Sequence, residues 1–288
     1  MNTEKGDYEY EQDGTQKFLF RLSDGNFIET VLMSHEYGLS VCVSTQVGCN
    51  MGCKFCASGL LKKQRDLTAG EMVNQVLTVM HDTQDRVSHV VIMGTGEPFD
   101  NYDNVMDFIR IINHAKGLAI GARHITLSTC GLCDKIEQYA NEGIQSNLAI
   151  SLHAPSDEVR DLIMPINKKY PMDVLRKTVE KYIQKTNRRV TFEYILLKDV
   201  NDSLAHARQL AHYMRGLNAY VNLIPYNAVD EHGFLQSNVK NVEAFKNELL
   251  RLKINATLRK EHGRDIDGAC GQLRAKKEGI ISGNHNKN

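Results

Sequence analysis

Short apolar runs separated by polar turns extend through most of this chain. The runs 17–22 and 27–33 predict two strands, and the Asp24-Gly25 pair between them predicts a β-hairpin turn. A third strand is expected at 38–45, directly before a group of cysteines. The beginning of the chain therefore predicts a hairpin and a third strand that leads into a loop.

Beyond that loop, strand-like and helix-like patterns alternate. Thr68, followed three residues later by Glu71, is a capping-box pattern that predicts a helix over 68–81. Strands that alternate with helices indicate parallel βαβ units. We therefore expect an α/β fold, an open or partial (β/α)6 barrel with an N-terminal β-hairpin extension, whose chemistry lies at the carboxyl ends of the strands. The later strands are expected at 88–93, 124–128, 147–152, 190–196, 220–224 and 255–258, and the later helices at 102–114, 134–141, 157–163, 172–185, 203–215 and 239–252.

The length and composition fit one catalytic domain. With 288 residues and 42% hydrophobic residues, the chain can bury a core. We expect the catalytic domain at 27–278, after a polar extension with the start of the hairpin at 1–26 and before a polar tail at 279–288. No apolar run approaches the roughly 18 residues of a membrane span, and the first residues are polar and acidic rather than signal-like. The protein is therefore expected in the cytoplasm, and we also expect it to be a monomer.

The overall charge gives no sign of a nucleic-acid binder. Lys plus Arg and Asp plus Glu both number 35, so the formal net charge is zero. Basic residues are grouped locally, but each group by itself is more typical of a solvated face than of an RNA contact. These groups would matter for RNA only if the fold brought them around one opening: Lys62, Lys63 and Arg65; Arg188 and Arg189; Arg274, Lys276 and Lys277.

Three of the seven cysteines lie close together, which indicates metal or redox chemistry rather than disulfides. Cys49, Cys53 and Cys56 have the spacing C-x3-C-x2-C directly after a predicted strand. Three thiolates can hold a [4Fe-4S] cluster and leave one iron open for the amine and carboxylate of a substrate, and Phe55 can pack over that cluster. The alternative is a zinc site that adds Cys42, but the spacing to Cys42 is unlike paired zinc knuckles. Iron is therefore favoured.

A second motif follows the next predicted strand. In Gly94-Thr-Gly96-Glu97-Pro98, glycine permits close approach of a cofactor, and the carboxylate can accept a hydrogen bond from an ammonium group. After a C-x3-C-x2-C loop, this pattern indicates a site for the amino group of S-adenosylmethionine (SAM). Other polar residues also lie at or just past predicted strand ends, where each alone is more typical of a turn cap: Ser128, Ser151, His153 and Asn227.

Taken in order, these motifs resemble the RlmN family of bacterial methyltransferases, radical SAM enzymes with dual specificity for ribosomal and transfer RNA. The resemblance extends from about Phe27 to Arg274. An ordered set of this length is highly specific. It consists of Cys42-Val-Ser-Thr-Gln-Val-Gly-Cys49, Gly94-Thr-Gly-Glu97-Pro98, Ala149-Ile-Ser-Leu-His153-Ala-Pro155, Met164-Pro-Ile-Asn167, Val221-Asn-Leu-Ile-Pro-Tyr-Asn227 and Asp265-Ile-Asp-Gly-Ala-Cys270-Gly-Gln-Leu.

The resemblance implies a role for each candidate residue. Cys270 corresponds to the methyl-carrying cysteine of the family, Cys42 to its partner and Glu29 to the residue assigned as proton acceptor. From the residues alone, Glu29 would instead be a solvent-facing strand carboxylate. The [4Fe-4S] cluster would be bound by Cys49, Cys53 and Cys56, and SAM by Gly96, Glu97, Ser128, Ser151, Leu152, His153 and Asn227.

The chemistry that the resemblance implies gives a reason for two distant cysteines. C2 of adenine is not nucleophilic, so direct transfer of a methyl cation from SAM would fail. In the family, one SAM methylates the Cys270 thiolate, and a 5'-deoxyadenosyl radical from a second SAM converts that S-methyl group to a carbon radical that adds to C2. Glu29 or Cys42 accepts the C2 proton, and Cys42 then attacks Cys270 to release the base and leave a transient disulfide.

The same resemblance implies the partners. They are 23S ribosomal RNA and transfer RNA, with the target adenine splayed from its stack, and a reductase or flavodoxin-type electron donor. Members of the family usually carry a helical N-terminal domain, whereas about 25 polar residues precede Phe27 here. Cys130 and Cys133 stand where other residues are expected; their C-x2-C spacing suggests a metal, but a helix-start pair without a role is favoured.

Two other functions stay open. The first is methylation of adenine C8, the reaction of a sister family that confers antibiotic resistance; Thr95 and Pro98 fit the C2 enzymes better. The second is an RNA-binding remnant with weak catalysis. Glu29, Cys42 and Cys270 argue against a remnant, because RNA binding alone requires none of them.

Overall fold

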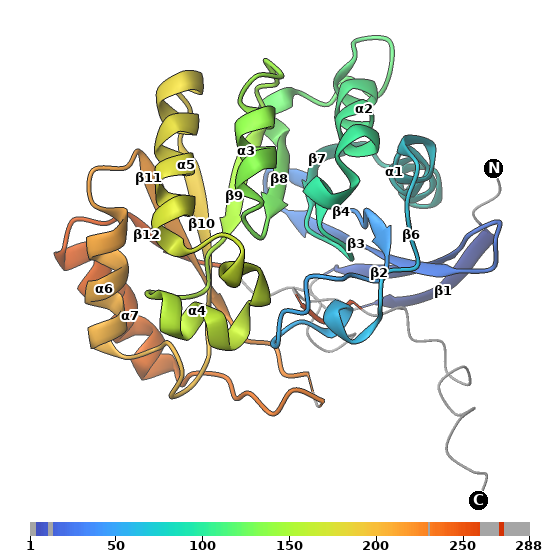
Figure 1. The fold of residues 1–288 in the computed structure, drawn as a ribbon. Coiled ribbons are helices and arrows are strands. Elements are labelled where there is room, and N and C mark those ends of the chain that lie inside the picture. The colour runs from blue at the N-terminus through green and yellow to red at the C-terminus, as the bar shows by residue number, and fades with distance from the viewer. Residues whose placement is uncertain (1–3, 11–13, 230, 260–270, 274–288) are drawn as a thin grey trace, which may run out of the picture.

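The strands form one continuous ten-stranded sheet in the order β1-β2-β3-β4-β7-β8-β9-β10-β11-β12 (Figure 1). The computed structural model describes residues 4–10, 14–229, 231–259 and 271–273. The strands of this sheet are β1 Glu4–Tyr10, β2 Gln16–Arg21, β3 Phe27–His35, β4 Gly38–Cys42, β7 Val87–Ile92, β8 Ile125–Thr129, β9 Asn147–Ser151, β10 Val190–Leu196, β11 Ala219–Pro225 and β12 Ala256–Leu258; β5 Gln46–Val47 and β6 Arg65–Asp66 pair separately.

The sheet has two parts that differ in strand direction. Strands β1 to β4 pair antiparallel, and the β2–β3 hairpin turns around Asp24 and Gly25 as predicted. Strands β4 and β7 to β12 are all parallel to their neighbours. Since β1 and β12 form two separate edges of the described sheet, the barrel is open. The expected partial (β/α) barrel with an N-terminal hairpin extension is therefore confirmed.

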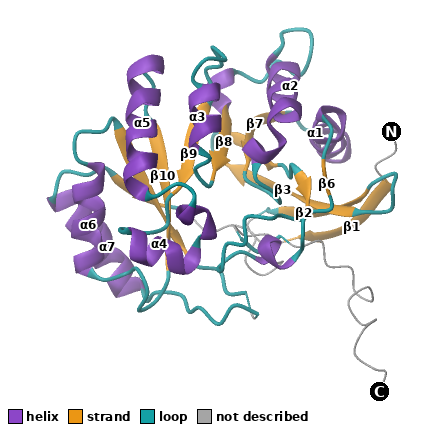
Figure 2. Cartoon of the chain, viewed as in Figure 1, coloured by secondary structure: helices purple, strands orange, loops and turns teal. Residues whose placement is uncertain are grey.

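Helices connect the parallel strands and cover the outer face of the curved sheet (Figure 2). Helix α1 begins where the capping box predicts: the Thr68 hydroxyl accepts from the Glu71 N–H, and the Glu71 carboxylate accepts from the Thr68 N–H. The α-helices are α1 Ala69–Thr83, α2 Tyr102–Asn113, α3 Cys133–Tyr139, α4 Asp157–Ile163, α5 Met172–Thr186, α6 Leu204–Met214 and α7 Val239–Arg251, and short 3-10 helices span Ala57–Leu60, Pro98–Asn101, Ala122–His124 and Pro165–Lys168.

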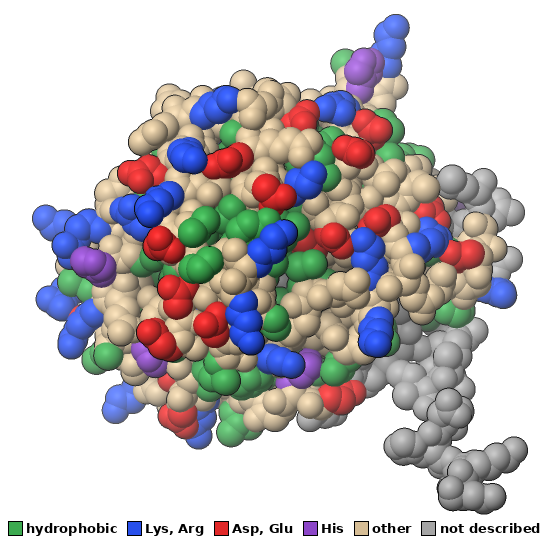
Figure 3. Space-filling view, viewed as in Figure 1, with side chains coloured by type: hydrophobic (Ala, Val, Ile, Leu, Met, Phe, Trp, Pro, Cys, Tyr) green, Lys and Arg blue, Asp and Glu red, His purple; other side chains and the backbone are tan. Residues whose placement is uncertain are grey.

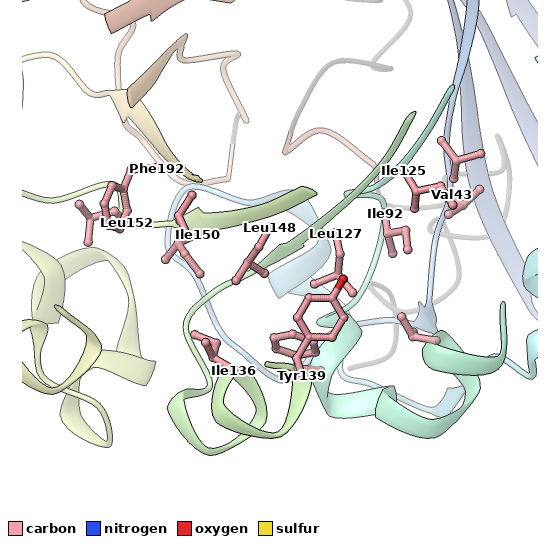
Figure 4. Packing of buried hydrophobic residues seen from close by; sticks show 14 of the residues in the cluster. Val43, Ile92, Ile125, Leu127, Ile136, Tyr139, Leu148, Ile150, Leu152 and Phe192 are labelled. Atoms are coloured by element: carbon pink, nitrogen blue, oxygen red, sulfur yellow. The ribbon is translucent and has the colours of Figure 1, made fainter. Parts of the chain in front are cut away.

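The main core lies between the sheet and these helices. Alternate residues of the strands, such as Leu127, Leu148 and Ile150, contribute to the same buried cluster as Ile136 and Tyr139 of α3 (Figure 4). Each such buried side chain stabilises the fold by roughly 1.5–3 kcal/mol relative to an exposed position. Because strand residues alternate between faces, the intervening residues point to the inner side of the barrel, where the site is built.

Two local features differ from the expectations. Residues 4–10 belong to a strand, β1, that pairs with β2, although the pattern predicts only a polar extension there. Strand β4 ends at Cys42 rather than at residue 45, because the main chain of Ser44 bonds at both N–H and C=O to the side chain of Gln75. Among the described helices, none is long and apolar enough to cross a membrane.

Candidate active site

The loop that carries the three clustered cysteines has a fixed course. Gly48 has a φ of 76°, and a Cβ atom there would lie 2.3 Å from the carbonyl oxygen of Lys62, so the turn requires glycine. Main-chain bonds then hold the loop to distant parts of the chain: Cys49 N to Leu61 O at 2.9 Å, Lys54 N to Ile163 O at 2.9 Å and Ala57 N to Gly271 O at 2.7 Å.

One cavity joins this loop to the carboxyl ends of the central strands. Eight of the ten residues expected to bind the cluster or SAM line it, because parallel strands bring their carboxyl ends to one edge of the sheet. Phe55, Met93, Cys130, Glu193 and Gly271 also line it, and the sequence pattern gives Cys130 and Glu193 no role. The eight are Cys49, Cys53, Cys56, Gly96, Glu97, Ser128, Ser151 and His153.

The three thiols are a donor set that suits an iron–sulfur cluster. Burial raises the pKa of Cys49 to about 12 and that of Cys53 well above its ordinary value, and repulsion among the three thiolates adds to both shifts. Thiolates gathered in this way therefore need positive charge from bound metal ions. In a [4Fe-4S] cluster each cysteine binds a different iron, so the sulfurs need not meet at one point.

The structure does not support the zinc alternative. Cys42 packs with Val31, Met33 and Leu273 rather than in the cavity with the other three cysteines. Across the described residues, no three His, Cys, Asp or Glu side chains gather closely enough to hold a single metal ion. The same finding applies to a metal site at Cys130 and Cys133.

Glu97 has both carboxylate oxygens in fixed positions. Oε1 accepts from the Phe99 N–H at 3.1 Å, and Oε2 accepts from the Cys130 N–H at 2.8 Å. Burial raises the pKa of Glu97, and these hydrogen bonds oppose the shift. The Thr129 and Cys130 side chains also hydrogen-bond to this carboxylate, so a ligand donor in the cavity would share or replace one of these bonds.

Arg160 is a fully buried residue that sequence reasoning missed. Its guanidinium donates to main-chain carbonyls at the ends of β8 and β9: Cys130 O at 2.7 Å, Leu152 O at 3.1 Å and Ser151 O at 3.3 Å. It also donates to Asn167 Oδ1 at 3.0 Å. Arg160 therefore fixes the strand ends that carry the candidate SAM residues. Its place one turn into α4 gives no local pattern that reveals this role.

His153 is held in a strained conformation and in its neutral form. Its φ is 57°, which is uncommon for a residue other than glycine, so neighbouring residues must hold this conformation in place. Its Nδ1 accepts from the Ile195 N–H at 3.1 Å, and its ring packs edge-on against Phe55 with centroids 4.8 Å apart. Burial, with a contribution from the Arg160 charge, lowers the pKa of His153 to about 3.

Two candidate SAM residues do not line this cavity. The Leu152 side chain lies in the main core. Asn227, just past β11, is buried, and within the described part of the chain its Oδ1 has no hydrogen-bond donor. A buried amide oxygen without a donor is costly, so this atom fits a role as acceptor from a bound molecule.

Glu29 and Cys42 lie on one face of the sheet. Cys42 pairs with Val31, and Glu29 is two residues before Val31 on β3, so the strand period places all three on the same side. Glu29 is buried at 3% exposure and forms an ion pair with Lys17, with Oε1 and Nζ 3.6 Å apart. The interpretation of Glu29 as a solvent-facing carboxylate is therefore wrong.

The segment after Cys270 packs against the cysteine loop. Cys270 itself lies outside the described residues. Gly271 lines the cavity, the Ser58 hydroxyl donates to the Leu273 carbonyl at 2.7 Å, and the Leu273 side chain contacts the cluster that contains Cys42. The residues that follow Cys270 thus connect the cavity to the face that carries Cys42.

Comparison with known proteins identifies the family. The model of the radical SAM superfamily matches residues 43–211. A probable dual-specificity RNA methyltransferase RlmN of Listeria monocytogenes is 62% identical over 273 residues, which cover 92% of this chain and 74% of that protein. The chain belongs to the RlmN family. A second RlmN relative, from Enterococcus faecalis, is also 62% identical, with 92% of this chain and 76% of the relative covered.

A solved structure of a radical SAM methyltransferase has a similar fold. The crystal structure of a radical SAM methyltransferase from Sphaerobacter thermophilus matches with a TM-score of 0.93 and 45% identity, covering 95% of this chain and 82% of the other. As a radical SAM enzyme, this RlmN-family protein uses a [4Fe-4S] cluster and SAM. The cavity with its three buried thiols and fixed carboxylate fits both.

Proposed function

We propose that this enzyme methylates C2 of adenosine in 23S ribosomal RNA and in transfer RNA, within a catalytic domain at 27–278. The RNA methyltransferase relatives support an RNA substrate. The observation that carries the finer proposal is the shared face of Glu29 and Cys42, next to the cavity and to the segment that follows Cys270. A methyltransferase that used SAM directly would need neither residue.

The cavity residues divide between two tasks. Cys49, Cys53 and Cys56 would hold the cluster. SAM would lie against Gly96, Glu97, Ser128, Ser151, Leu152, His153 and Asn227, with the Glu97 oxygens and the Asn227 Oδ1 as acceptors. When bound, these groups supply a methyl group and a carbon-centred radical that abstracts hydrogen.

The remaining chemistry belongs to the side chains of the protein. The Cys270 sulfur carries the methyl carbon, which becomes joined to C2 of the base. Glu29 or Cys42 accepts the proton that C2 loses, and the low exposure of Glu29 keeps water from competing for that role. The adduct must also give up one electron, which the cluster held by the three cysteines would accept. The Cys42 thiolate then attacks the Cys270 sulfur, and the bond from that sulfur to the bridging carbon breaks. The bridging carbon keeps the electron pair of that bond and takes up a proton, so the base leaves with a methyl group. An external thiol reduces the resulting disulfide.

Three further expectations accompany this proposal. The enzyme works as a monomer, in the cytoplasm, and accepts electrons from a reductase or flavodoxin-type donor. The electron donor and the RNA are separate partners.

Two measurements test the proposal. Reconstituted enzyme is incubated with ribosomal RNA and methyl-labelled SAM, and the nucleosides are separated by mass spectrometry against 2-methyladenosine and 8-methyladenosine standards. We expect the C2 product; the C8 product would assign the sister reaction instead. Cys42→Ala should trap a covalent protein–RNA adduct that Cys270→Ala does not form. Normal turnover by Cys42→Ala would exclude the disulfide step.

A further inference from the structure

A second, polar cavity opens at the opposite end of the barrel. Its lining comes from the amino-terminal ends of the parallel strands: Tyr37 precedes β4, Arg123 precedes β8, Arg188 and Arg189 precede β10, and Tyr220 lies near the start of β11. These five residues are called the lower mouth below. They come from four separate segments, which the parallel strands bring to one edge of the sheet.

The lower mouth carries positive charge that the described structure leaves uncompensated. Within the described residues, none of Arg123, Arg188 and Arg189 has a carboxylate at ion-pair distance. Arg188 donates from Nη2 to the neutral side chain of Asn147, at 3.0 Å from Oδ1, and its Nε is buried with no hydrogen-bond acceptor. The basic group that follows the cysteine loop differs, whereas Arg274, Lys276 and Lys277 lie outside the described residues. Lys63 pairs with Asp66 and Asp100, and Arg65 pairs with Asp24 and Glu71.

Charges of both signs are mixed on the face that Figure 3 draws, where Lys and Arg are interspersed with Asp and Glu. Since the net charge is zero, the three arginines of the lower mouth are a local exception that attracts anions over short range.

Aromatic rings surround these arginines. The Arg189 guanidinium lies 4.3 Å from the Tyr220 ring centroid. The Tyr37 ring stacks on His35 with centroids 4.6 Å apart, yet it remains 65% exposed. His89 and His124 extend this arrangement, since His89 packs edge-on against Tyr37 and stacks on His124 at 4.3 Å. Tyr37 is exposed and Tyr220 is half-buried. Arginines interleaved with accessible aromatic rings are a combination that binds single-stranded nucleic acid, through phosphates and stacked bases.

The lower mouth leads to the candidate active site through the barrel. The polar cavity continues from the lower mouth into the barrel, where it is lined by Thr191 and Glu193 of β10 and Asn222 of β11. Thr191 and Glu193 are two positions apart on their strand, so both side chains point inward. Met93, Glu193 and Arg259 line both this cavity and the one that holds the clustered cysteines. The two cavities are therefore adjacent inside the barrel, on either side of these three residues.

We propose that the lower mouth is the entry site for a single-stranded segment of the substrate RNA, in which Arg123, Arg188 and Arg189 bind phosphates and Tyr37 and Tyr220 stack bases. The target base then passes through the polar cavity toward the cysteine loop. This inference rests on the proposed RNA substrate. It assigns a binding face to the part of the barrel that lies opposite the cluster.

The test compares two triple variants with equal loss of charge. One is Arg123→Gln, Arg188→Gln and Arg189→Gln. The control is Lys177→Gln, Lys181→Gln and Lys240→Gln, on the outer helices α5 and α7. Affinity for a fluorescein-labelled single-stranded oligoribonucleotide that contains adenosine is measured by fluorescence anisotropy between about 50 and 200 mM salt.

The arginine variant should bind the oligoribonucleotide about 10- to 100-fold more weakly at 0.1 M salt, with the slope of log K against log salt reduced by about 2 for three lost phosphate contacts. The control should bind as wild type does. Equal loss in both variants, or none in the arginine variant, would overturn the proposal. So would normal RNA binding combined with lost reduction by a flavodoxin-type protein, which would make the lower mouth a docking site for the electron donor.

Two additional measurements keep the result interpretable. Thermal unfolding shows whether the triple variant is still folded. If it is not, the single variants Arg189→Gln and Tyr37→Leu, at exposed positions, replace it. Each of them should weaken RNA binding several-fold. Nucleoside analysis with wild-type enzyme tests the proposed function separately. If wild type methylates RNA while the lower-mouth variants bind and methylate it normally, the entry site is wrong and the function stands; if wild type methylates no RNA, the function fails.

Discussion

The Glu97 carboxylate accepts a 2.8 Å hydrogen bond from the main-chain N–H of Cys130, which joins the segment after β7 to the end of β8. The other oxygen accepts from the Phe99 N–H. One side chain therefore fixes two turns at the mouth of the candidate active site. Glu97, which the sequence indicates only as a SAM-binding residue, therefore also stabilises the main chain around the site.

Replacing Glu97 by Gln should weaken both the fold and SAM binding. The amide can keep one acceptor but presents an N–H group to the second N–H donor, so one buried hydrogen bond is lost at a cost of about 1–3 kcal/mol. Urea unfolding and equilibrium dialysis with SAM measure the two effects. Glu142→Gln, at a partly exposed carboxylate outside the cavity, is the control. Wild-type stability in Glu97→Gln would show that the two hydrogen bonds contribute little.

The iron content should depend on the three clustered cysteines and not on the others. Anaerobically reconstituted protein should be brown and contain about four irons per chain, and Cys49→Ala, Cys53→Ala or Cys56→Ala should abolish the colour and the cleavage of SAM. Cys133→Ala, at the start of α3 and outside the cavity, should keep both. Stoichiometric zinc without iron would contradict the cluster assignment.

Local sequence patterns predicted most of the helices, strands and turns, because residues close in sequence determine where these elements begin and end. The capping box at Thr68 and Glu71 and the turn at Asp24-Gly25 are set by neighbouring residues, and both are confirmed. Strand β1 was missed because its partner, β2, supplies the stabilisation that its polar sequence lacks. A pattern of apolar residues cannot reveal a strand whose formation depends on an edge of an existing sheet.

Site residues could be predicted from sequence where they belong to a motif of characteristic spacing. They could not be predicted where their environment depends on tertiary packing. The cysteine loop and the glycine motif indicated their cavity from sequence. Burial of Glu29 depends on its ion pair with Lys17 of the neighbouring strand, which its own strand does not reveal. Arg160 gives no signal, because a lone arginine in a helix usually faces solvent.

His153 should make the protein less stable in acid. Folding lowers the pKa of His153 from its ordinary value of 6.5 to about 3. Between these two pH values, His153 is therefore mostly protonated in the unfolded chain and mostly neutral in the folded chain. Stability should therefore be unaffected by His153 above pH 6.5 and should decrease toward pH 3 by up to about 1.4 kcal/mol per pH unit. Urea unfolding between pH 7 and pH 5 measures this slope. His153→Gln should flatten it relative to wild type, whereas His81→Gln, at an exposed position, should not; equal slopes in all three proteins would contradict the neutral buried imidazole.

Arg160 should act as a positioning residue for SAM, and a matched arginine separates this role from simple stability. Arg160 donates to the main chain at the ends of β8 and β9, while Arg176 donates to the carbonyls of Tyr213 and Arg215 on the outside of the barrel. In each case lysine keeps the charge but cannot reproduce the planar set of donors. Both substitutions should destabilise the fold, Arg160→Lys by roughly 3 kcal/mol because it leaves buried carbonyls unpaired, and Arg176→Lys by less. Only Arg160→Lys should weaken SAM binding, by about tenfold or more. The carbonyls that Arg160 holds belong to Ser151, Leu152 and Cys130, which lie at the candidate SAM site, whereas those that Arg176 holds do not. SAM affinity measured by calorimetry under conditions in which both variants remain folded tests this difference, and equal SAM affinity in the two variants would limit Arg160 to a structural role.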